Sequence, residues 1–535
     1  MQHFNEQEEY NSFLFSVDRN IEAQMSEGGA IPTELRQEFN QRGFRLTQST
    51  AIEKEGNRWL LRDGKSRREY VVAKKGDRLS IYGNLHVVNQ VVERDLCVRC
   101  GACEPACPVD IIRFDHQAYP YITDEAKCIT TCTRCLKVCP GEVVNLARLD
   151  QEMYAAEPHP DSVTGIARRA LVSFATDDKL RFEGTSGGFV TQILLYMLDK
   201  RLIDGALVLG SSDNEGWQEK PFIARTRDEL KRAVKSKYIA TPFLRPLREM
   251  EEIEGNYAVV ALPCYIHGLR KYQRVSKALR ERIKLVIGLY CNVVFEPYLF
   301  DDVCEFSGFR KEDVVDFHFR HGEWPGGVYA TMRNGDKRKI LKLEEMKDEF
   351  NTLKLLYAAP RCNMCVDFSA EYADIAVGDP WLRGPDGKYL FEDGRTTVLT
   401  RTDSGDSIVQ RAAAEHYINV EELSLKTYMV NFERSGRYKR DFVPKNIMLR
   451  QLLRLPVPQY FRPIGHGKIR GFLPLFIKLA ILEMARFRWF RKVGVSIAQR
   501  KPVIAWLARN RMRKQKKFAL AYPKLEKWVE RFSSR

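Results

Sequence analysis

The chain has 535 residues, too many for a single hydrophobic core, so several domains are expected. Hydrophobic residues make up 44% of it, as in globular proteins, and no run of about 18 uncharged apolar residues predicts a transmembrane helix. Residues 464–535 contain 19 Lys/Arg and 3 Asp/Glu, which equals the net charge of +16 of the whole chain, so the other residues balance and are not expected to bind polyanions generally.

Residues 1–90 are predicted to form an N-terminal helical and β-meander region. Residues 1–42 are polar and predict helices, whereas residues 43–47, 58–62, 69–73 and 78–82 predict short strands joined by Asp-Gly and Gly-Asp turns. The polar, acidic start has no signal-peptide pattern, and the thirteen cysteines then indicate a reducing cytoplasm. This region could cover a metal cluster or contact a partner, but packing is the simpler role.

Residues 91–150 carry two cysteine runs that each end in Cys-Pro. The cysteines are Cys97, Cys100, Cys103 and Cys107 in the first run and Cys128, Cys132, Cys135 and Cys139 in the second. This is the spacing of a bacterial ferredoxin-like domain with two 4Fe–4S clusters, where the fourth cysteine of each run binds the other cluster. We therefore expect Cys139 to join the first run and Cys107 the second. Zinc and disulfides are the alternatives, and the longer gap after Cys128 makes that ligand the least secure.

From residue 165 to 420 the chain alternates strand-like and helical segments. Apolar strands are predicted at 170–175, 205–210, 257–263 and 283–290, and an amphipathic helix at 189–199. This rhythm predicts an α/β core whose sheet is covered on both faces, within an overall α+β and α/β multidomain fold. The turn at 184–188, Gly-Thr-Ser-Gly-Gly, could bind the pyrophosphate of FAD at a helix N-terminus, or simply cap the helix through Ser186.

Four further cysteines form a candidate third cluster site. Cys264 and Cys291 each follow a predicted strand, and Cys362 and Cys365 form a short knuckle. Ligands bind beyond the strand ends of open α/β sheets, so these thiols could hold a 4Fe–4S cluster, although buried thiols are also common in cores.

Two neighbouring segments are candidates for the same site. His267 lies three residues after Cys264 and is a candidate proton donor, against the structural role that a lone histidine usually has. The Gly-rich stretch 320–327 could cover the site as a loop, or its Trp324 could be a packed aromatic.

Residues 165–385 resemble the coenzyme F420 hydrogenase/dehydrogenase β-subunit family. The matching motifs lie at 184–191, 235–238, 262–264, 288–291, 362–367 and 373–379. The resemblance implies a flavoprotein with FAD at Gly187, Gly188 and Thr191, with Lys235 and Tyr238 nearby, and a 4Fe–4S cluster on the four further cysteines. It also implies an oxidoreductase that uses coenzyme F420, or one that uses ferredoxin to reduce an organic substrate. An electron-relay subunit of a larger complex is a third interpretation.

Residues 421–535 lie beyond the resemblance and are predicted to form a basic, partly amphipathic helical extension. Apolar segments at 471–490 and 502–508 are followed by cations and contain Trp489 and Trp506, a pattern typical of helices on a membrane surface. An acidic protein partner such as ferredoxin, or packing on the body, are the alternatives, and no motif favours nucleic acid. The predicted location is cytoplasmic, and peripheral at the membrane if the extension binds lipid.

Overall fold

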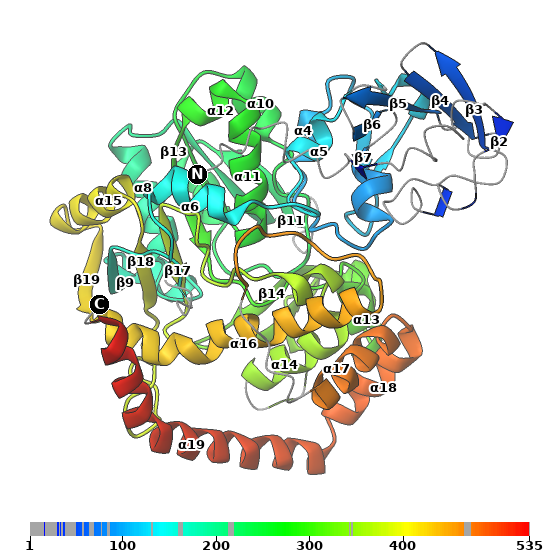
Figure 1. The fold of residues 1–535 in the computed structure, drawn as a ribbon. Helices are drawn as coiled ribbons and strands as arrows, with labels where there is room; N and C mark the ends of the chain where they lie inside the picture. The colour runs from blue at the N-terminus through cyan, green and yellow to red at the C-terminus, as the bar shows by residue number, and fades with distance from the viewer. Residues whose placement is uncertain are drawn as a thin grey trace.

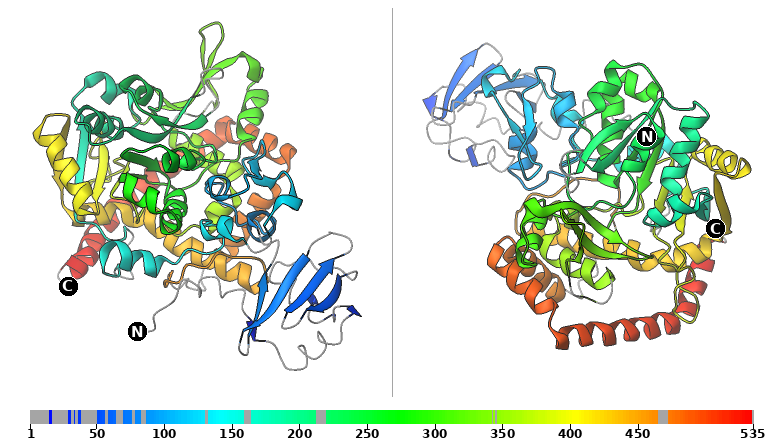
Figure 2. Two further views of the ribbon diagram at one scale, coloured as in Figure 1. Left: turned by 90° about the horizontal axis from the view of Figure 1, so that it is seen from above. Right: turned by 180° about the vertical axis from the view of Figure 1, so that it is seen from behind.

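The computed structural model describes residues 86–129, 132–158, 164–211, 219–341, 343, 346–464 and 472–533, with six short N-terminal strands and residues 33, 36 and 37. Figure 1 shows a mixed α/β body with the N-terminal strands to one side and the C-terminal helices along its lower edge. The two further views in Figure 2 show the same separation. None of the described helices is both long and apolar enough to cross a bilayer.

The N-terminal strands form a six-stranded antiparallel sheet in the order β1-β6-β5-β4-β3-β2. They are β1 (Phe15–Ser16), β2 (Gly29–Ala30), β3 (Thr50–Glu55), β4 (Arg58–Asp63), β5 (Glu69–Lys75) and β6 (Arg78–Tyr82). The meander predicted at 58–82 is confirmed as β4, β5 and β6. β1 and β2 fall where helices were predicted, and most of residues 1–42 and the strand predicted at 43–47 lie outside the described residues.

An eight-stranded mixed sheet in the order β11-β10-β12-β13-β17-β18-β9-β19 is the base of the main body. Its strands are β9 (Arg169–Ala175), β10 (Gly205–Ser211), β11 (Glu219–Ala224), β12 (Tyr257–Ala261), β13 (Ile283–Leu289), β17 (Ile375–Gly378), β18 (Thr396–Thr400) and β19 (Ile418–Leu423). β10, β12, β13 and β17 are parallel, and antiparallel strands complete both sides. The four predicted strands are confirmed, whereas β11, which contains Lys220 and Pro221, was not predicted.

Helices cover both faces of this sheet, as the α/β rhythm predicts. Successive strand residues point to opposite faces, so Ala258 packs in one core with α8 (Phe189–Asp199) and α15 (Asp403–Ala414). Its neighbour Val259 packs in the other core, with α11 (Pro263–Val275) and the cysteine-rich segment. The helix predicted at 189–199 is confirmed as α8.

The cysteine-rich segment sits directly against the second of these faces. It contains α4 (Cys103–Ala106), α5 (Arg134–Lys137), α6 (Leu146–Tyr154) and the antiparallel hairpin of β7 (Ile112–Phe114) and β8 (Pro120–Ile122). A Cβ on Gly101, whose φ is +88°, would lie 2.7 Å from the backbone carbon of Pro242. The Leu244 N–H donates to the Cys100 carbonyl at 2.7 Å, so backbone meets backbone at this contact.

A smaller layer and the C-terminal helices complete the body. The strands β14 (Val314–His321), β15 (Gly327–Met332) and β16 (Lys337–Lys339) form an antiparallel sheet, and β14 and β15 share a core with α13 (Leu299–Phe306) and α14 (Met346–Tyr357). The chain then forms α16 (Leu425–Leu452), α17 (Phe472–Met484), α18 (Arg488–Ala498) and α19 (Lys501–Ser533). In Figure 1, α19 runs from α18 back toward the start of α16 and β19.

Candidate functional site

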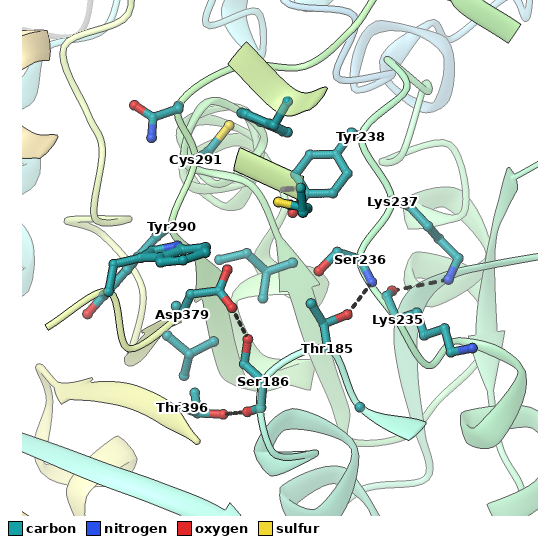
Figure 3. Close-up of a pocket in the computed structure, with 18 of the residues that line it drawn as sticks. Thr185, Ser186, Lys235, Ser236, Lys237, Tyr238, Tyr290, Cys291, Asp379 and Thr396 are labelled. Atoms are coloured by element: carbon teal, nitrogen blue, oxygen red, sulfur yellow. Dashed lines mark hydrogen bonds between the residues drawn. The ribbon is translucent and has the colours of Figure 1, made fainter. Parts of the chain in front are cut away.

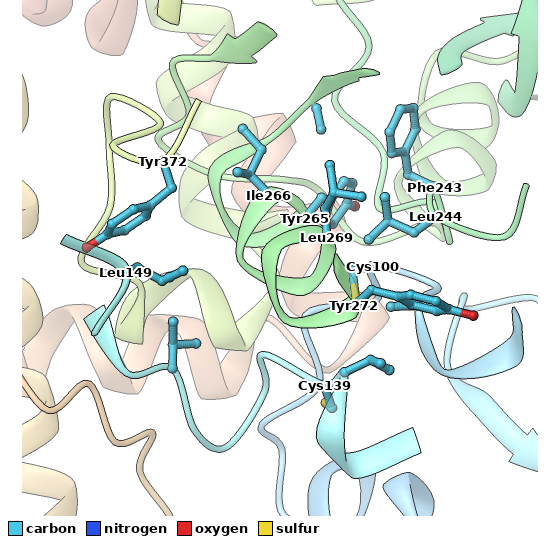
Figure 4. Packing of buried hydrophobic residues seen from close by; sticks show 14 of the residues in the cluster. Cys100, Cys139, Leu149, Phe243, Leu244, Tyr265, Ile266, Leu269, Tyr272 and Tyr372 are labelled. Atoms are coloured by element: carbon cyan, nitrogen blue, oxygen red, sulfur yellow. The ribbon is translucent and has the colours of Figure 1, made fainter. Parts of the chain in front are cut away.

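The first group of thiols contains three cysteines of the first run and one of the second. Burial raises the pKa of the Cys97 thiol to about 12, and Cys139 adds to the rise. Burial also raises the pKa of Cys100 and Cys103 well above the usual value, again with a contribution from Cys139. Cys139 therefore lies beside the first run, as Figure 4 shows for Cys100 and Cys139 below α11.

The second group contains the remaining ferredoxin-type cysteines. Burial raises the pKa of the Cys128 thiol, and the nearest contributing thiols are Cys107 and Cys132. Burial raises the pKa of Cys135 to about 12, with Cys128 and Cys132 among the contributing neighbours. The structure thus places Cys107 with the second run, and Cys128 stays with this group despite its irregular spacing.

The four cysteines outside the ferredoxin-type runs also come together. Burial raises the pKa of Cys264 well above the usual value, followed by contributions from Cys365, Cys291 and Cys362, and then from Cys100 of the first group. The third group therefore adjoins the first. Cys304 is buried in the separate core beside the three-stranded sheet.

The surroundings of the thiols suit iron–sulfur clusters, which together with their cysteine ligands are negatively charged. Backbone N–H groups point at sulfur: Arg99 at Cys97 and Gly141 at Cys139, both at 3.3 Å, and Val294 at Cys362 at 3.4 Å. N–H···S hydrogen bonds of this kind tune cluster potentials. A Cβ on Gly268 of α11 would lie 3.3 Å from the Cys100 sulfur, so α11 packs closely against this thiol.

Buried cations add to this fit. Lys439, 2% exposed, donates to the Asp367 carbonyl at 3.0 Å and opposes the rise that burial causes in the pKa of Cys291 and Cys362. Lys271 donates to the Cys139 carbonyl at 2.7 Å. The described residues contain no set of three or more His, Cys, Asp or Glu side chains already arranged around a metal ion, so the fit rests on donor chemistry.

A cavity of about 900 Å³ lies at the carboxyl ends of the parallel strands. The last residues of β12, β13 and β17 and the second half of β10 contribute to its wall, where open α/β sheets bind ligands. Cys291 also lines it, so the cavity borders the third group of thiols (Figure 3). Lys354 lines the same wall, and burial lowers the pKa of this lysine to about 8.

The glycine turn predicted to bind FAD forms the floor of the cavity. Gly188, with φ +69°, caps α8 in the left-handed conformation, and both it and Thr191 line the cavity. Gly187 is not among the described lining residues: a Cβ there would lie 2.6 Å from the Gly394 carbonyl oxygen, so its place is in packing the turn. The Ser236 N–H donates to Thr185 Oγ1 at 2.8 Å, which ties the turn to the next segment (Figure 3).

That next segment contains the two other predicted cofactor residues. Lys235 and Tyr238 both line the cavity, and Lys235 has a φ of +77°. Burial lowers the pKa of Lys235, which places a cation in a partly desolvated position near the turn. The ring of Tyr238 packs against Phe319 and Phe350, with centroids 5.2 and 5.1 Å apart.

Asp379, which sequence reasoning did not single out, organises the other side of the turn. It follows β17 and accepts hydrogen bonds from Ser186 and from both terminal nitrogens of Arg320, at 2.7 and 3.0 Å. Trp324 Nε1 donates to it at 3.1 Å, so the stretch 320–327 contacts Asp379, but none of these described residues lines the cavity that the stretch was predicted to cover. Burial works against ionisation, but Arg320 holds the pKa of Asp379 below its usual range. Its position directly after a buried strand was the available signal.

His267 contacts the loop that follows Cys365 of the third group of thiols. It is 3% exposed, and its Nε2 lies 3.1 Å from Asp367 Oδ2, while its ring packs edge-on against Tyr372. It is not among the described residues that line the cavity. This is the environment of a structural histidine that positions the loop after Cys365.

Family models match most of the body. For the beta subunit of coenzyme F420 hydrogenase/dehydrogenase, the amino-terminal model matches residues 170–248 and the carboxyl-terminal model matches residues 254–426. Residues 86–156 match a 4Fe–4S dicluster domain. The three ranges coincide with the glycine turn, the third group of thiols and the two ferredoxin-type runs.

Individual relatives show the same similarity. The chain is 32% identical over 304 residues to a coenzyme F420 hydrogenase subunit beta of Methanothermobacter thermautotrophicus, covering 55% of this chain and 99% of that protein. It is 31% identical over 373 residues to a coenzyme F420-dependent sulfite reductase of Methanocaldococcus jannaschii, covering 65% of this chain and only 52% of that protein. A solved F420-reducing NiFe hydrogenase complex of Methanosarcina barkeri aligns with a TM-score of 0.44 and 22% identity, over 56% of this chain and 97% of that one.

Proposed function

Because the chain belongs to the coenzyme F420 hydrogenase/dehydrogenase β-subunit family, we propose that it is an FAD- and iron–sulfur-dependent oxidoreductase that passes electrons between coenzyme F420 and 4Fe–4S clusters. One observation carries this proposal. The cavity shares Cys291 with the third group of thiols, and that group adjoins Cys100 of the first. A redox cofactor in the cavity would therefore lie at one end of a continuous series of cluster sites.

The cavity residues suit FAD, which when bound would exchange a hydride for single electrons. The N–H groups at the start of α8 would bind its pyrophosphate, because a helix N-terminus favours anions. Thr185 and Ser186 line this end, and Lys235 and Lys237 add positive charge beside it. Asp379 fixes the turn through Ser186, and Gly187 allows the turn to pack against Gly394.

The twelve cysteines of the three groups are proposed as ligands of three 4Fe–4S clusters. The four of the first group would hold one cluster, and the second and third groups one each. Lys439, Arg361 and Lys271 would offset the negative charge of the loaded clusters, since buried charge needs a partner. His267 would keep the Asp367 loop in place, without a proton-transfer role in the cavity.

An anaerobic stopped-flow experiment tests the proposal. Cluster- and flavin-loaded protein is mixed with reduced coenzyme F420, and we expect bleaching of the flavin followed by bleaching of the clusters. Cys291→Ser should retain the first bleaching and lose most of the second, whereas Cys304→Ser, in a separate core, should behave as wild type. Equal cluster bleaching in both variants would contradict the proposed path.

A second candidate is a ferredoxin-dependent reductase of an organic substrate. It would be favoured if reduced F420 bleaches nothing in protein whose flavin a low-potential ferredoxin still reduces. An electron-relay subunit of a larger complex would instead show cluster reduction without turnover of any small molecule.

The exposed side of the C-terminal helices is proposed as a membrane-surface contact. Trp489, Val493 and Ile497 recur every four residues on α18 and are between 45% and 59% exposed. Such an apolar stripe in a basic segment suits an anionic lipid surface. Co-sedimentation with phosphatidylglycerol vesicles, lost in Trp489→Glu, would support this. Binding to an acidic ferredoxin but not to vesicles would favour the protein-partner alternative.

A further inference from the structure

The basic helix α19 forms one wall of the cavity. Its lining residues recur every three or four positions and so belong to one helix face: Ala508, Arg511, Met512, Gln515 and Phe518, with Lys514 at the edge of that face. The second family-model range ends at residue 426, so this wall lies outside the matched ranges.

Specific contacts hold α19 against the body. Arg511 pairs with Asp348 of α14, and Phe518 and Tyr522 of α19 are both buried. A Cβ on Gly387 would lie 2.7 Å from the Gln515 carbonyl oxygen, and Gly387 has a φ of +77°. The loop at Gly387 can therefore approach the backbone of α19 only because it has no side chain there.

The cavity is strongly basic, and the proposed FAD site explains only part of its charge. Eight Lys/Arg and three Asp/Glu line it. Lys235 and Lys237 stand beside the glycine turn, and Lys354 is near Cys362 and Cys291. The other five cations line the part of the cavity where α14, the loop around Gly387 and α19 meet, which we call the outer end: Lys347, Arg383, Lys388, Arg511 and Lys514.

Aromatic rings connect the outer end with the inner part of the cavity. Trp381 lies 4.7 Å, centroid to centroid, from Trp324, which in turn donates to Asp379 beside the glycine turn. Lys347 Nζ lies 4.8 Å from the Trp381 ring, and the Arg383 guanidinium lies 3.9 Å from the ring of Tyr389. The cations are thus positioned on rigid rings, at the distances of cation–π contacts.

We propose that the outer end, including Arg511 and Lys514 of α19, binds a phosphate or carboxylate group of the substrate, while the planar part of the substrate reaches inward along the aromatic rings. This proposal rests on the proposed function only in taking the planar part to be the deazaflavin ring of coenzyme F420. Positive charge focused in a concave site raises the affinity for an anionic substrate, so α19 would be a specificity element and not solely a surface tail.

Paired probes test the role of charge. 5-Deazariboflavin and its 5′-phosphate share one ring system and differ by the anionic group, and their binding to the full, cofactor-loaded protein can be followed by fluorescence. We expect the phosphate to bind about 5- to 20-fold more tightly, and Arg511→Gln with Lys514→Gln to reduce this preference to about 2-fold or less.

A matched pair of substitutions separates a local effect from net charge. Arg513→Gln with Lys517→Gln removes the same charge from the opposite side of α19, outside the cavity lining, and should retain the preference. Lys514→Gln alone leaves the Arg511–Asp348 pair intact and should lose part of the preference even if the double variant is unstable. An equal preference in the two double variants, or equally tight binding of both deazaflavins to wild type, would overturn the proposal.

A ring-independent probe distinguishes this proposal from the proposed function. If neither deazaflavin binds, the proposed use of F420 fails, and calorimetric titration of flavin-loaded protein with inorganic tripolyphosphate still tests the outer end. Binding that weakens at least about 5-fold in Lys514→Gln, but not in Lys517→Gln, would support the anion site. Equal binding in both variants, or no binding in wild type, would refute it.

Discussion

Replacing Glu296 should loosen the contact between the cysteine-rich segment and the α/β core. Arg99, in the loop of the first cysteine run, makes two parallel hydrogen bonds to Glu296, at 2.8 and 2.6 Å. The two side chains are 2% and 7% exposed. Although burial opposes its charge, Glu296 raises the pKa of Arg99, so the guanidinium stays charged.

The burial of this pair sets the expected magnitude. Removing one partner of a buried ion pair leaves an uncompensated charge and costs about 3–5 kcal/mol. Glu296→Ala should therefore lower the urea concentration at which cluster absorbance is lost. Asp301→Ala breaks the Lys311–Asp301 pair, whose side chains are 47% and 53% exposed, and should cost less than about 1 kcal/mol.

The assay compares cluster loss in urea for wild type and both variants, because a chain of several domains need not unfold in two states. Arg99→Met combined with Glu296→Leu removes both charges and should recover much of the loss. Equal midpoints for Glu296→Ala and Asp301→Ala would refute the reasoning, since they would show that the buried pair does not hold the segment in place.

Three further substitutions test the site. Asp379→Asn leaves buried Arg320 without its counter-charge, so we expect at least about 2 kcal/mol of destabilisation and a lower flavin-to-iron ratio, measured on purified protein. Cys291→Ser should lower the iron content from about 12 to about 8 per chain, since one cluster of three would be lost; an unchanged content would exclude Cys291 as a ligand. Burial lowers the pKa of Lys478 to about 7, so only the unfolded chain binds its proton between pH 7 and 10.5 and stability should rise with pH across that range. Lys478→Met should flatten this rise in unfolding midpoints, whereas exposed Lys492→Met should not.

Local sequence patterns predicted the parts of the fold that depend on neighbouring residues. The strands at 170–175 and 283–290 are mostly apolar, interrupted only by Ser173 and Lys284, because both sheet faces are covered. The glycine turn also appears where predicted, at the start of α8. In each case one short segment carries its own signal.

Features that join distant segments had no comparable signal. Asp379 pairs with Arg320, 59 residues away in the sequence, and His267 contacts Asp367, 100 residues away. The basic pattern of α19 predicted an amphipathic helix but not which face would line a cavity, since that depends on the loop at Gly387. β11 was missed because an edge strand tolerates Pro221, whose missing N–H would disrupt a central strand.

The backbone contact at Gly101 has a consequence for how electrons would travel. The Leu244–Cys100 hydrogen bond and the close approach of Gly101 to Pro242 hold the ferredoxin-type segment against the core through main-chain contacts. A carrier that swings between two docking positions would have to break these contacts in every cycle. The segment would instead stay in place during electron transfer, because folding fixes the distances between its proposed clusters. Electron transfer between them should then proceed at the same rate in buffer and in concentrated glycerol, because no part of the path has to diffuse.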